Sequence, residues 1–318
     1  MMKIFIYSVL MTIGITASAI ANDNISFSVD FPSTMGDEQD GRLLLMLSNN
    51  DKSEPRFQIN PSPQGQIIFG VDIKDWQPGT AITMGNDILG YPFDSLKDVP
   101  AGDYYVQAVI NRYKDFNLSN GKTVSLPPEM GEGQKWNRKP GNFYSKPMKI
   151  TISESDAQII EITMDQEIAA IKPPKDTKYI KHIKMKSEML SKFWGEDVEL
   201  GAHVLLPEGF DEHPEAKYPL MIFHGHFPAD FGGFSETPPD PNMKPTYSAR
   251  FDWDGYNVYQ AQAAHDFYKK WISETFPRFI IIEVQHATPY YDDSYAVNSA
   301  SQGPYGDAIT YELIPHIE

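Results

Sequence analysis

The residues with the clearest chemical potential are two histidines, His224 and His226, which flank Gly225 directly after a short apolar run at 218–223. Such a run predicts a buried strand, and ligands of open α/β sheets bind beyond the carboxyl ends of strands. Glycine allows a tight turn there, so backbone N–H groups can stabilise an oxyanion during acyl transfer. The turn at 224–226 is therefore a candidate oxyanion site. A plain strand-terminating turn is the other interpretation.

The same histidines raise the alternative of a metal site, because two imidazoles at this spacing could bind Zn²⁺. A binuclear hydrolase would place an Asp and a His directly afterwards, but residues 227–229 are Phe, Pro and Ala. Residues 252–255 resemble the start of a calcium loop but lack the bidentate Glu at its end. We predict neither a metal nor a cofactor.

A nucleophile is missing from the pattern. Serine hydrolases of this kind carry Gly-x-Ser-x-Gly at a strand-to-helix turn, and the closest sequence, at 233–237, ends in Thr and lies in a Pro/Gly-rich stretch. The chain contains no Cys that could replace the serine. His286 follows the apolar run 279–284 and could act as a base, but no nucleophile accompanies it. We expect His286 to have a structural or substrate-binding role.

The elements that must position these residues divide into two sets. Residues 22–168 show alternating or short apolar runs between turn signals and no helical period, which predicts an immunoglobulin-like β-sandwich. The expected strands are 25–31, 42–48, 66–71, 103–111, 149–152 and 158–164. The stretch 169–176 contains paired prolines and predicts a stiff linker.

Residues 177–318 change to an alternation of strands and helices, which predicts an α/β domain with a largely parallel sheet. The expected strands are 179–185, 198–206, 218–223 and 279–284, and the expected helices are 258–271 and 306–317. The Pro/Gly-rich insertion 230–256 is a candidate lid.

Composition restricts the partners. The 318 residues carry a net charge of −16, which argues against binding nucleic acid or anionic lipid. Residues 1–21 combine a basic start, an apolar run and a small-residue end, so we predict a signal peptide cleaved after Ala21 and a secreted or periplasmic protein with no membrane insertion after cleavage.

Several segments, in the same order along the chain, resemble the secreted esterases of the esterase D/enterochelin-esterase-like branch of the α/β hydrolases. They are AHVLLPEGF (202–210), YPL (218–220), HGHF (224–227), PRFI (277–280), PYYDDSY (289–295), NS (298–299), GPYGDA (303–308) and ELIPHIE (312–318). The resemblance implies that 177–318 form the N-terminal half of an α/β-hydrolase domain. The β domain is similar to sandwich modules that precede such hydrolases.

The resemblance also implies a serine ester hydrolase with an acyl-enzyme mechanism and a small-molecule or glycan ester as substrate. His226, with Phe227 as second choice, would supply the oxyanion N–H, while other residues would contact substrate: His224, Gly225, His286, Tyr290, Tyr291 and Asp292. The family's nucleophile, acid and base would follow Glu318, so we expect an N-terminal portion that is inactive alone. The alternative is a non-catalytic exported protein that binds carbohydrate or another partner through Trp and Tyr side chains.

Overall fold

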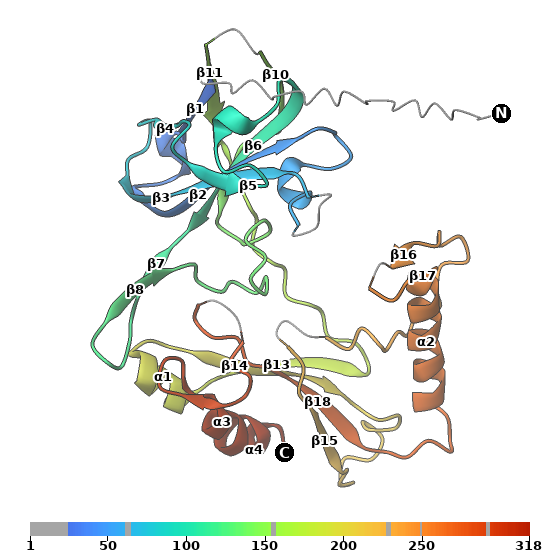
Figure 1. The fold of residues 1–318 in the computed structure, drawn as a ribbon. Helices are drawn as coiled ribbons and strands as arrows, with labels where there is room; N and C mark the ends of the chain where they lie inside the picture. Colours follow the sequence, from blue (N-terminus) through green and yellow to red (C-terminus); the bar gives the residue numbers. More distant parts are fainter. Residues whose placement is uncertain (1–24, 61–64, 154–156, 227–229, 249, 291–292) are drawn as a thin grey trace, which may run out of the picture.

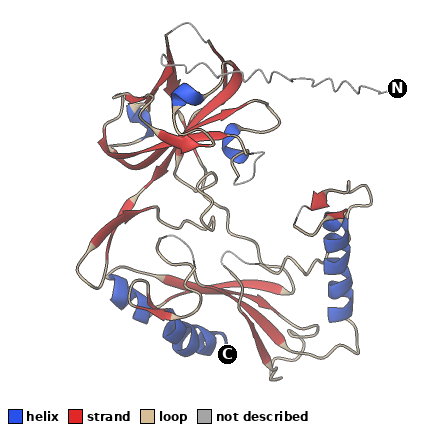
Figure 2. Ribbon diagram, viewed as in Figure 1, coloured by secondary structure: helices blue, strands red, loops and turns tan. Residues whose placement is uncertain are grey.

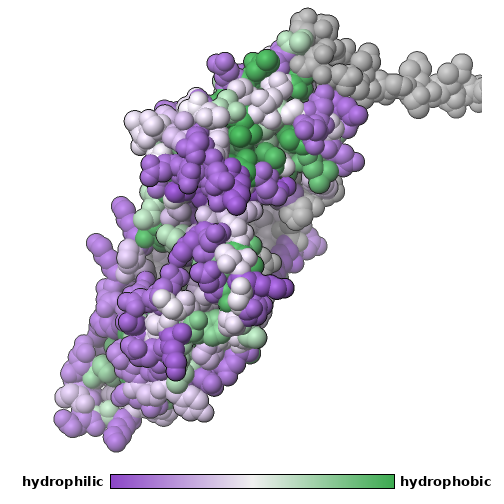
Figure 3. Space-filling view, turned by 90° about the vertical axis from the view of Figure 1, so that its left-hand side faces the viewer, coloured by the Kyte–Doolittle hydropathy of each residue, from purple (hydrophilic) through white to green (hydrophobic). Residues whose placement is uncertain are grey.

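The structure is a computed structural model that describes residues 25–60, 65–153, 157–226, 230–248, 250–290 and 293–318 (Figure 1). The predicted signal peptide and three predicted site residues, Phe227, Tyr291 and Asp292, lie outside the described residues. Within them, no helix has the length and apolar character needed to cross a bilayer. Figure 3 shows hydrophilic side chains over much of one face, as the high net charge predicts.

The first half of the chain consists of strands and short 3₁₀ turns (Figure 2). The strands are β1 (Ile25–Asp30), β2 (Gln39–Ser48), β3 (Ile67–Trp76), β4 (Ile82–Met84), β5 (Leu89–Tyr91), β6 (Gly102–Arg112), β7 (Lys114–Asn117), β8 (Thr123–Leu126), β9 (Phe143–Tyr144), β10 (Met148–Ile152), β11 (Gln158–Thr163) and β12 (Gln166–Glu167). The 3₁₀ turns are η1 (Ser33–Met35), η2 (Pro55–Phe57) and η3 (Leu96–Asp98). All six strands expected here are therefore confirmed.

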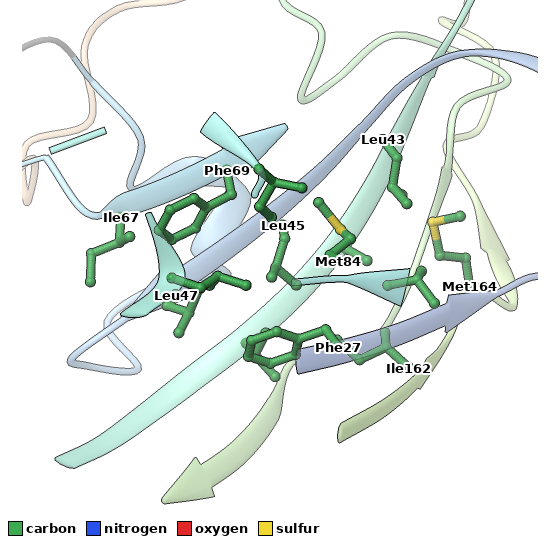
Figure 4. Packing of buried hydrophobic residues seen from close by; sticks show 14 of the residues in the cluster. Phe27, Leu43, Leu45, Leu47, Ile67, Phe69, Met84, Ile162 and Met164 are labelled. Carbon is green, nitrogen blue, oxygen red and sulfur yellow. The ribbon is translucent and has the colours of Figure 1, made fainter. Parts of the chain in front are cut away.

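Two sheets enclose the core of this half. One has the order β11-β1-β4, and the other has the order β12-β9-β6-β2-β3-β5 with β10 also paired to β6. Burial alternates along β1 because successive side chains point to opposite faces, so Phe27 and Val29 face inward. Phe27, Leu45 and Phe69 meet in this core, which Figure 4 shows at close range.

The second half contains the helices and a four-stranded sheet. Its elements are β13 (Ile180–Lys186), α1 (Glu188–Trp194), β14 (Glu199–Leu205), β15 (Leu220–Phe223), β16 (Tyr247–Ser248), β17 (Trp253–Asp254), α2 (Tyr256–Trp271), β18 (Ile280–Gln285), β19 (Asn298–Ser299), β20 (Gly303–Pro304), α3 (Tyr305–Ala308), the π-helical turn η4 (Ile309–Leu313) and α4 (Ile314–Ile317). The expected helices at 258–271 and 306–317 are confirmed, as are the positions of the four expected strands. The prediction that the run at 218–223 is buried is wrong, because β15 is an edge strand in which Met221, Ile222 and Phe223 are 38–49% exposed.

The four-stranded sheet has the order β13-β14-β18-β15. Apolar residues of β14 and β18, among them Ala202, Val204 and Ile282, pack on α1 and on the helical C-terminal segment. The opposite face packs in part on Trp271 of α2 and on Phe234 of the loop between β15 and β16. The two faces of this sheet are therefore covered by different parts of the chain.

The predicted fold class, an immunoglobulin-like sandwich followed by half of an α/β-hydrolase domain with a mostly parallel sheet, is wrong. In the second-half sheet only β15 and β18 are parallel, whereas β13–β14 and β14–β18 are antiparallel. The seven-residue α1 spans about 10 Å, too short to return the chain along the roughly 23 Å of β13. In the first half β1 pairs with β11 in parallel. The described residues form mixed and antiparallel sheets instead.

Helix α1 was not expected from the sequence, although its ends carry clear signals. The Ser187 Oγ accepts a hydrogen bond from the Leu190 N–H at 3.2 Å, and Gly195 ends the helix with φ of +71°. The Glu312 carboxylate bonds to the Ser187 hydroxyl and accepts from the Met189 N–H at 3.0 Å. These contacts tie the helix to the C-terminal segment.

The β7–β8 hairpin connects the two halves. Figure 1 shows it extending from the first half toward α1. The Phe116 ring packs 4.9 Å from the Tyr290 ring and 6.2 Å from the Trp194 ring. The Lys114 ammonium lies 3.1 Å from the Glu196 carboxylate at the rim of this contact. Aromatic packing therefore joins the halves away from the linker.

Trp271 is the anchor of α2, and its removal tests the importance of that packing. Its side chain is 1% exposed, and its Nε1–H donates to the Leu206 carbonyl at 2.8 Å. We expect Trp271→Ala to lower the free energy of unfolding by about 3–5 kcal/mol. Tyr311→Ala, at a 67% exposed position, should change it by less than about 0.5 kcal/mol. Urea unfolding followed by far-UV circular dichroism measures both; equal effects would contradict the prediction.

Candidate functional site

The segments after β15 and β18 meet at one edge of the sheet. These two strands are parallel neighbours, so their carboxyl ends lie side by side. The His286 Nε2 lies 3.1 Å from the Gly225 carbonyl oxygen, and the His226 Nδ1 lies 3.0 Å from an Asp293 carboxylate oxygen. The structure thus brings the predicted residues Gly225, His226 and His286 together.

The pair His226–Asp293 has the geometry of a general base. The Asp293 side chain is completely buried, whereas that of His226 is 72% exposed. A second carboxylate oxygen of Asp293 accepts from the Tyr295 N–H at 3.0 Å, which fixes the carboxylate. A carboxylate can only accept, so the His226 Nδ1 carries a proton, and in the neutral form of the ring Nε2 is the nitrogen with the lone pair. An exposed imidazole nitrogen oriented in this way can take a proton from water.

His286 has a different role from His226, because it is 2% exposed. Its Nε2–H donates to the Gly225 carbonyl, so its Nδ1 accepts from the Ser294 hydroxyl at 3.0 Å. Burial lowers the pKa of His286, against the smaller opposing effects of the Gly225 hydrogen bond and the Asp293 charge. A neutral His286 therefore holds the Gly225 carbonyl, and in a trans peptide the following His226 N–H points the opposite way.

Ser294 makes the contact expected of a serine nucleophile with a base, but its burial decides against that role. It is 3% exposed, and its Oγ also accepts from the Ala296 N–H at 3.1 Å. A substrate carbonyl cannot reach an oxygen buried in this way. Ser294 therefore orients His286 and stabilises the loop after β18.

The remaining predicted residues have distinct positions. His224 is exposed and follows β15 directly, beside Gly225. Tyr290 is 8% exposed, lies between the Phe116 and Trp194 rings, and donates to the Ser301 carbonyl at 3.3 Å. Its ring therefore belongs to the contact between the halves. Within the described ranges, no cluster of three or more His, Cys, Asp or Glu side chains could hold a metal ion.

A second set of ionisable residues, which the sequence analysis missed, lies on one sheet face. A cavity of about 1080 Å³ lies between this face and the segments 129–131 and 173–177. His182 and His203 line it as direct cross-strand partners, with ring centroids 4.6 Å apart. The His182 Nδ1 lies 3.0 Å from the Asp176 carboxylate. Because successive side chains of a strand point to opposite faces, the sequence pattern could have predicted that His182 and His203 share one face of the sheet.

Glu283 completes this row, because it is the strand partner of His203 on β18. It is 4% exposed, and burial, with a smaller effect of the Asp230 charge, raises its pKa to about 7. Burial also lowers the pKa of His203, reinforced by His182 and opposed by Asp230. Both side chains therefore favour their neutral forms. His182 and His203 line the cavity and are available for binding, whereas Glu283 is buried and is not among the lining residues.

The amino-acid sequence was compared with protein-family models and with curated proteins. No protein-family model matches the chain, and no curated protein matches it.

Burial of Glu283 makes stability depend on pH. A folded-state pKa near 7, above the ordinary value of 4.5, means that stability is complete below pH 4.5 and declines as the pH rises through 7. Glu283→Gln removes this titration, so we expect the variant to exceed the wild type by roughly 1–3 kcal/mol at pH 8 and to match it near pH 4.

Urea unfolding across this pH range measures the difference. Glu274→Gln, at an exposed position, is the matched control and should follow the wild type at every pH. Parallel stability curves for Glu283→Gln and the wild type would show that Glu283 does not titrate in this way.

Proposed function

We propose that this chain acts in the hydrolysis of a small-molecule or glycan ester outside the cytoplasm. The observation that carries the proposal is the pair of a buried Asp293 carboxylate and an exposed His226 imidazole beside the turn after β15. The segment resemblance supports the same reaction class, and the signal-like pattern of residues 1–21 supports export.

The geometry supports a water nucleophile. The His226 Nε2 accepts a proton from a water molecule as the water oxygen bonds to the ester carbonyl carbon, and the carbonyl electron pair moves onto oxygen. Asp293 holds the imidazole in the required tautomer and stabilises the imidazolium that forms. When the intermediate collapses, the leaving alkoxide takes the proton from Nε2, which yields an acid and an alcohol.

The turn after β15 would stabilise the oxyanion. Because His286 holds the Gly225 carbonyl, the next N–H, that of His226, is oriented away from it before substrate arrives. A donor fixed in advance needs no reorganisation during the reaction, which is the basis of oxyanion stabilisation. His286 is therefore a positioning residue, and His226 contributes both its backbone N–H and its ring.

Replacement of the general base tests the proposal. The expectation of a chain that is inactive alone assumes a serine nucleophile, whereas a water nucleophile needs no serine. We expect the 318-residue chain to hydrolyse p-nitrophenyl acetate above the buffer rate, and His226→Ala to lower kcat/KM by about 100-fold. Added imidazole should restore part of the lost rate, because it replaces the missing ring. Asp293→Asn should also lower the rate, since the tautomer is no longer fixed.

His213→Ala is the matched control, because His213 is an exposed histidine in the loop between β14 and β15, outside both loops of the site. It should retain the wild-type rate. Hydrolysis that is unchanged in His226→Ala would refute the role of His226. Loss of wild-type activity with a serine-directed phosphonate would instead assign the reaction to a serine nucleophile.

A further inference from the structure

A cluster of aromatic side chains covers the surface at the start of α2. Its members come from β16, β17, the turn between them and the first turn of the helix. We call this cluster the aromatic platform, and it consists of Tyr247, Phe251, Trp253, Tyr256 and Tyr259. Four of them are 43–62% exposed, and Tyr256 is half-buried. Large exposed aromatic groups in one place indicate a binding surface.

Four of the five rings, all except Tyr247, contact one another directly. The centroids of Phe251 and Tyr256 are 4.5 Å apart, those of Trp253 and Tyr259 are 4.9 Å apart, and those of Trp253 and Tyr256 are 5.5 Å apart. These separations leave no room for a ligand between the rings, which excludes an aromatic cage around an ammonium group. A ligand can only stack on the outward faces.

Backbone and side-chain hydrogen bonds hold the platform in place. The Asn257 side chain accepts from the Thr246 N–H at 2.8 Å and donates to the Lys244 carbonyl at 2.9 Å. The Tyr247 hydroxyl donates to the Asp252 carboxylate at 2.7 Å across the hairpin. Figure 1 shows this hairpin at the N-terminal end of α2. The rings are therefore ordered before a ligand binds, which reduces the entropy cost of binding.

Charge narrows the class of ligand. The exposed carboxylates of Asp252 and Asp254 lie beside Tyr247, and the Arg250 guanidinium lies over the Phe251 ring, 5.3 Å from its centroid. The whole chain carries −16. Nucleic acids and anionic lipids are repelled by this charge. A neutral sugar is compatible with it, because its C–H face can stack on the exposed rings and its hydroxyl groups carry no charge. We infer that the aromatic platform binds a neutral polysaccharide.

The inference does not depend on ester hydrolysis, so the two can fail separately. Affinity electrophoresis of the full chain in native gels that contain galactomannan, xyloglucan or hydroxyethylcellulose tests it. We expect at least one of these to retard the wild type. Trp253→Ala and Tyr259→Ala should each weaken that binding about tenfold or more, through loss of a stacking face. Trp253→Phe should retain most of it.

Two controls make the result specific. Tyr311→Ala, which removes a 67% exposed ring elsewhere, should bind like the wild type. His226→Ala should also bind like the wild type, since it affects only the proposed hydrolytic site. Circular dichroism and thermal unfolding establish that each variant is folded.

Three outcomes would overturn the inference. The wild type could migrate unchanged with all three polysaccharides. Folded Trp253→Ala and Tyr259→Ala could bind as tightly as the wild type, which would place binding elsewhere. Binding to phosphatidylcholine vesicles in the absence of polysaccharide binding would identify the platform as a membrane contact instead.

Discussion

The arrangement of the second half depends on one strand, β18, which is paired on both sides. Its antiparallel partner β14 and its parallel partner β15 fix its position in the sheet, and therefore the edge at which the loop after β18 begins. Side chains that alternate along β18 then face different surroundings, with Ile282 and Val284 in the apolar core and Glu283 beside His203. The end of the strand places His286 next to Gly225. One short apolar segment therefore positions both groups of ionisable residues.

An aromatic contact also joins the two halves of the molecule. The β7–β8 hairpin leaves the first half and places Phe116 against Trp194 and Tyr290. Tyr290 follows β18 by only a few residues, so the same loop that carries Asp293 also carries the ring that receives the hairpin. Packing between the halves and the orientation of the candidate base are consequently features of one loop.

The sequence was sufficient to locate every described strand of five or more residues and the long helix, because alternation and helical spacing are local properties. The relative directions of the strands are not a local property of the sequence. Whether β14 and β18 run parallel depends on pairing between residues about 80 positions apart, which periodicity does not report. Helix α1 was missed because seven residues give too few turns for a clear period, although Ser187 and Gly195 mark its ends.

The candidate site was predictable in part for the same reason. The turn at 224–226 and the position of His286 followed from the ends of two apolar runs. The partner of the His226 ring did not, since Asp293 lies 67 residues further along the chain. Glu283 stands within the run Phe-Ile-Ile-Ile-Glu-Val, where the sequence gives no sign that its neighbour across the sheet is a histidine.

The buried carboxyl group on β18 has a calorimetric consequence. Because its pKa is about 7 in the folded protein, near-neutral unfolding exposes a carboxylic acid that then ionises and releases a proton to the buffer. The measured heat of unfolding therefore includes the protonation enthalpy of that buffer. Amine buffers, which bind protons exothermically, and phosphate, which binds them with little heat, would report different unfolding enthalpies for one and the same conformational change.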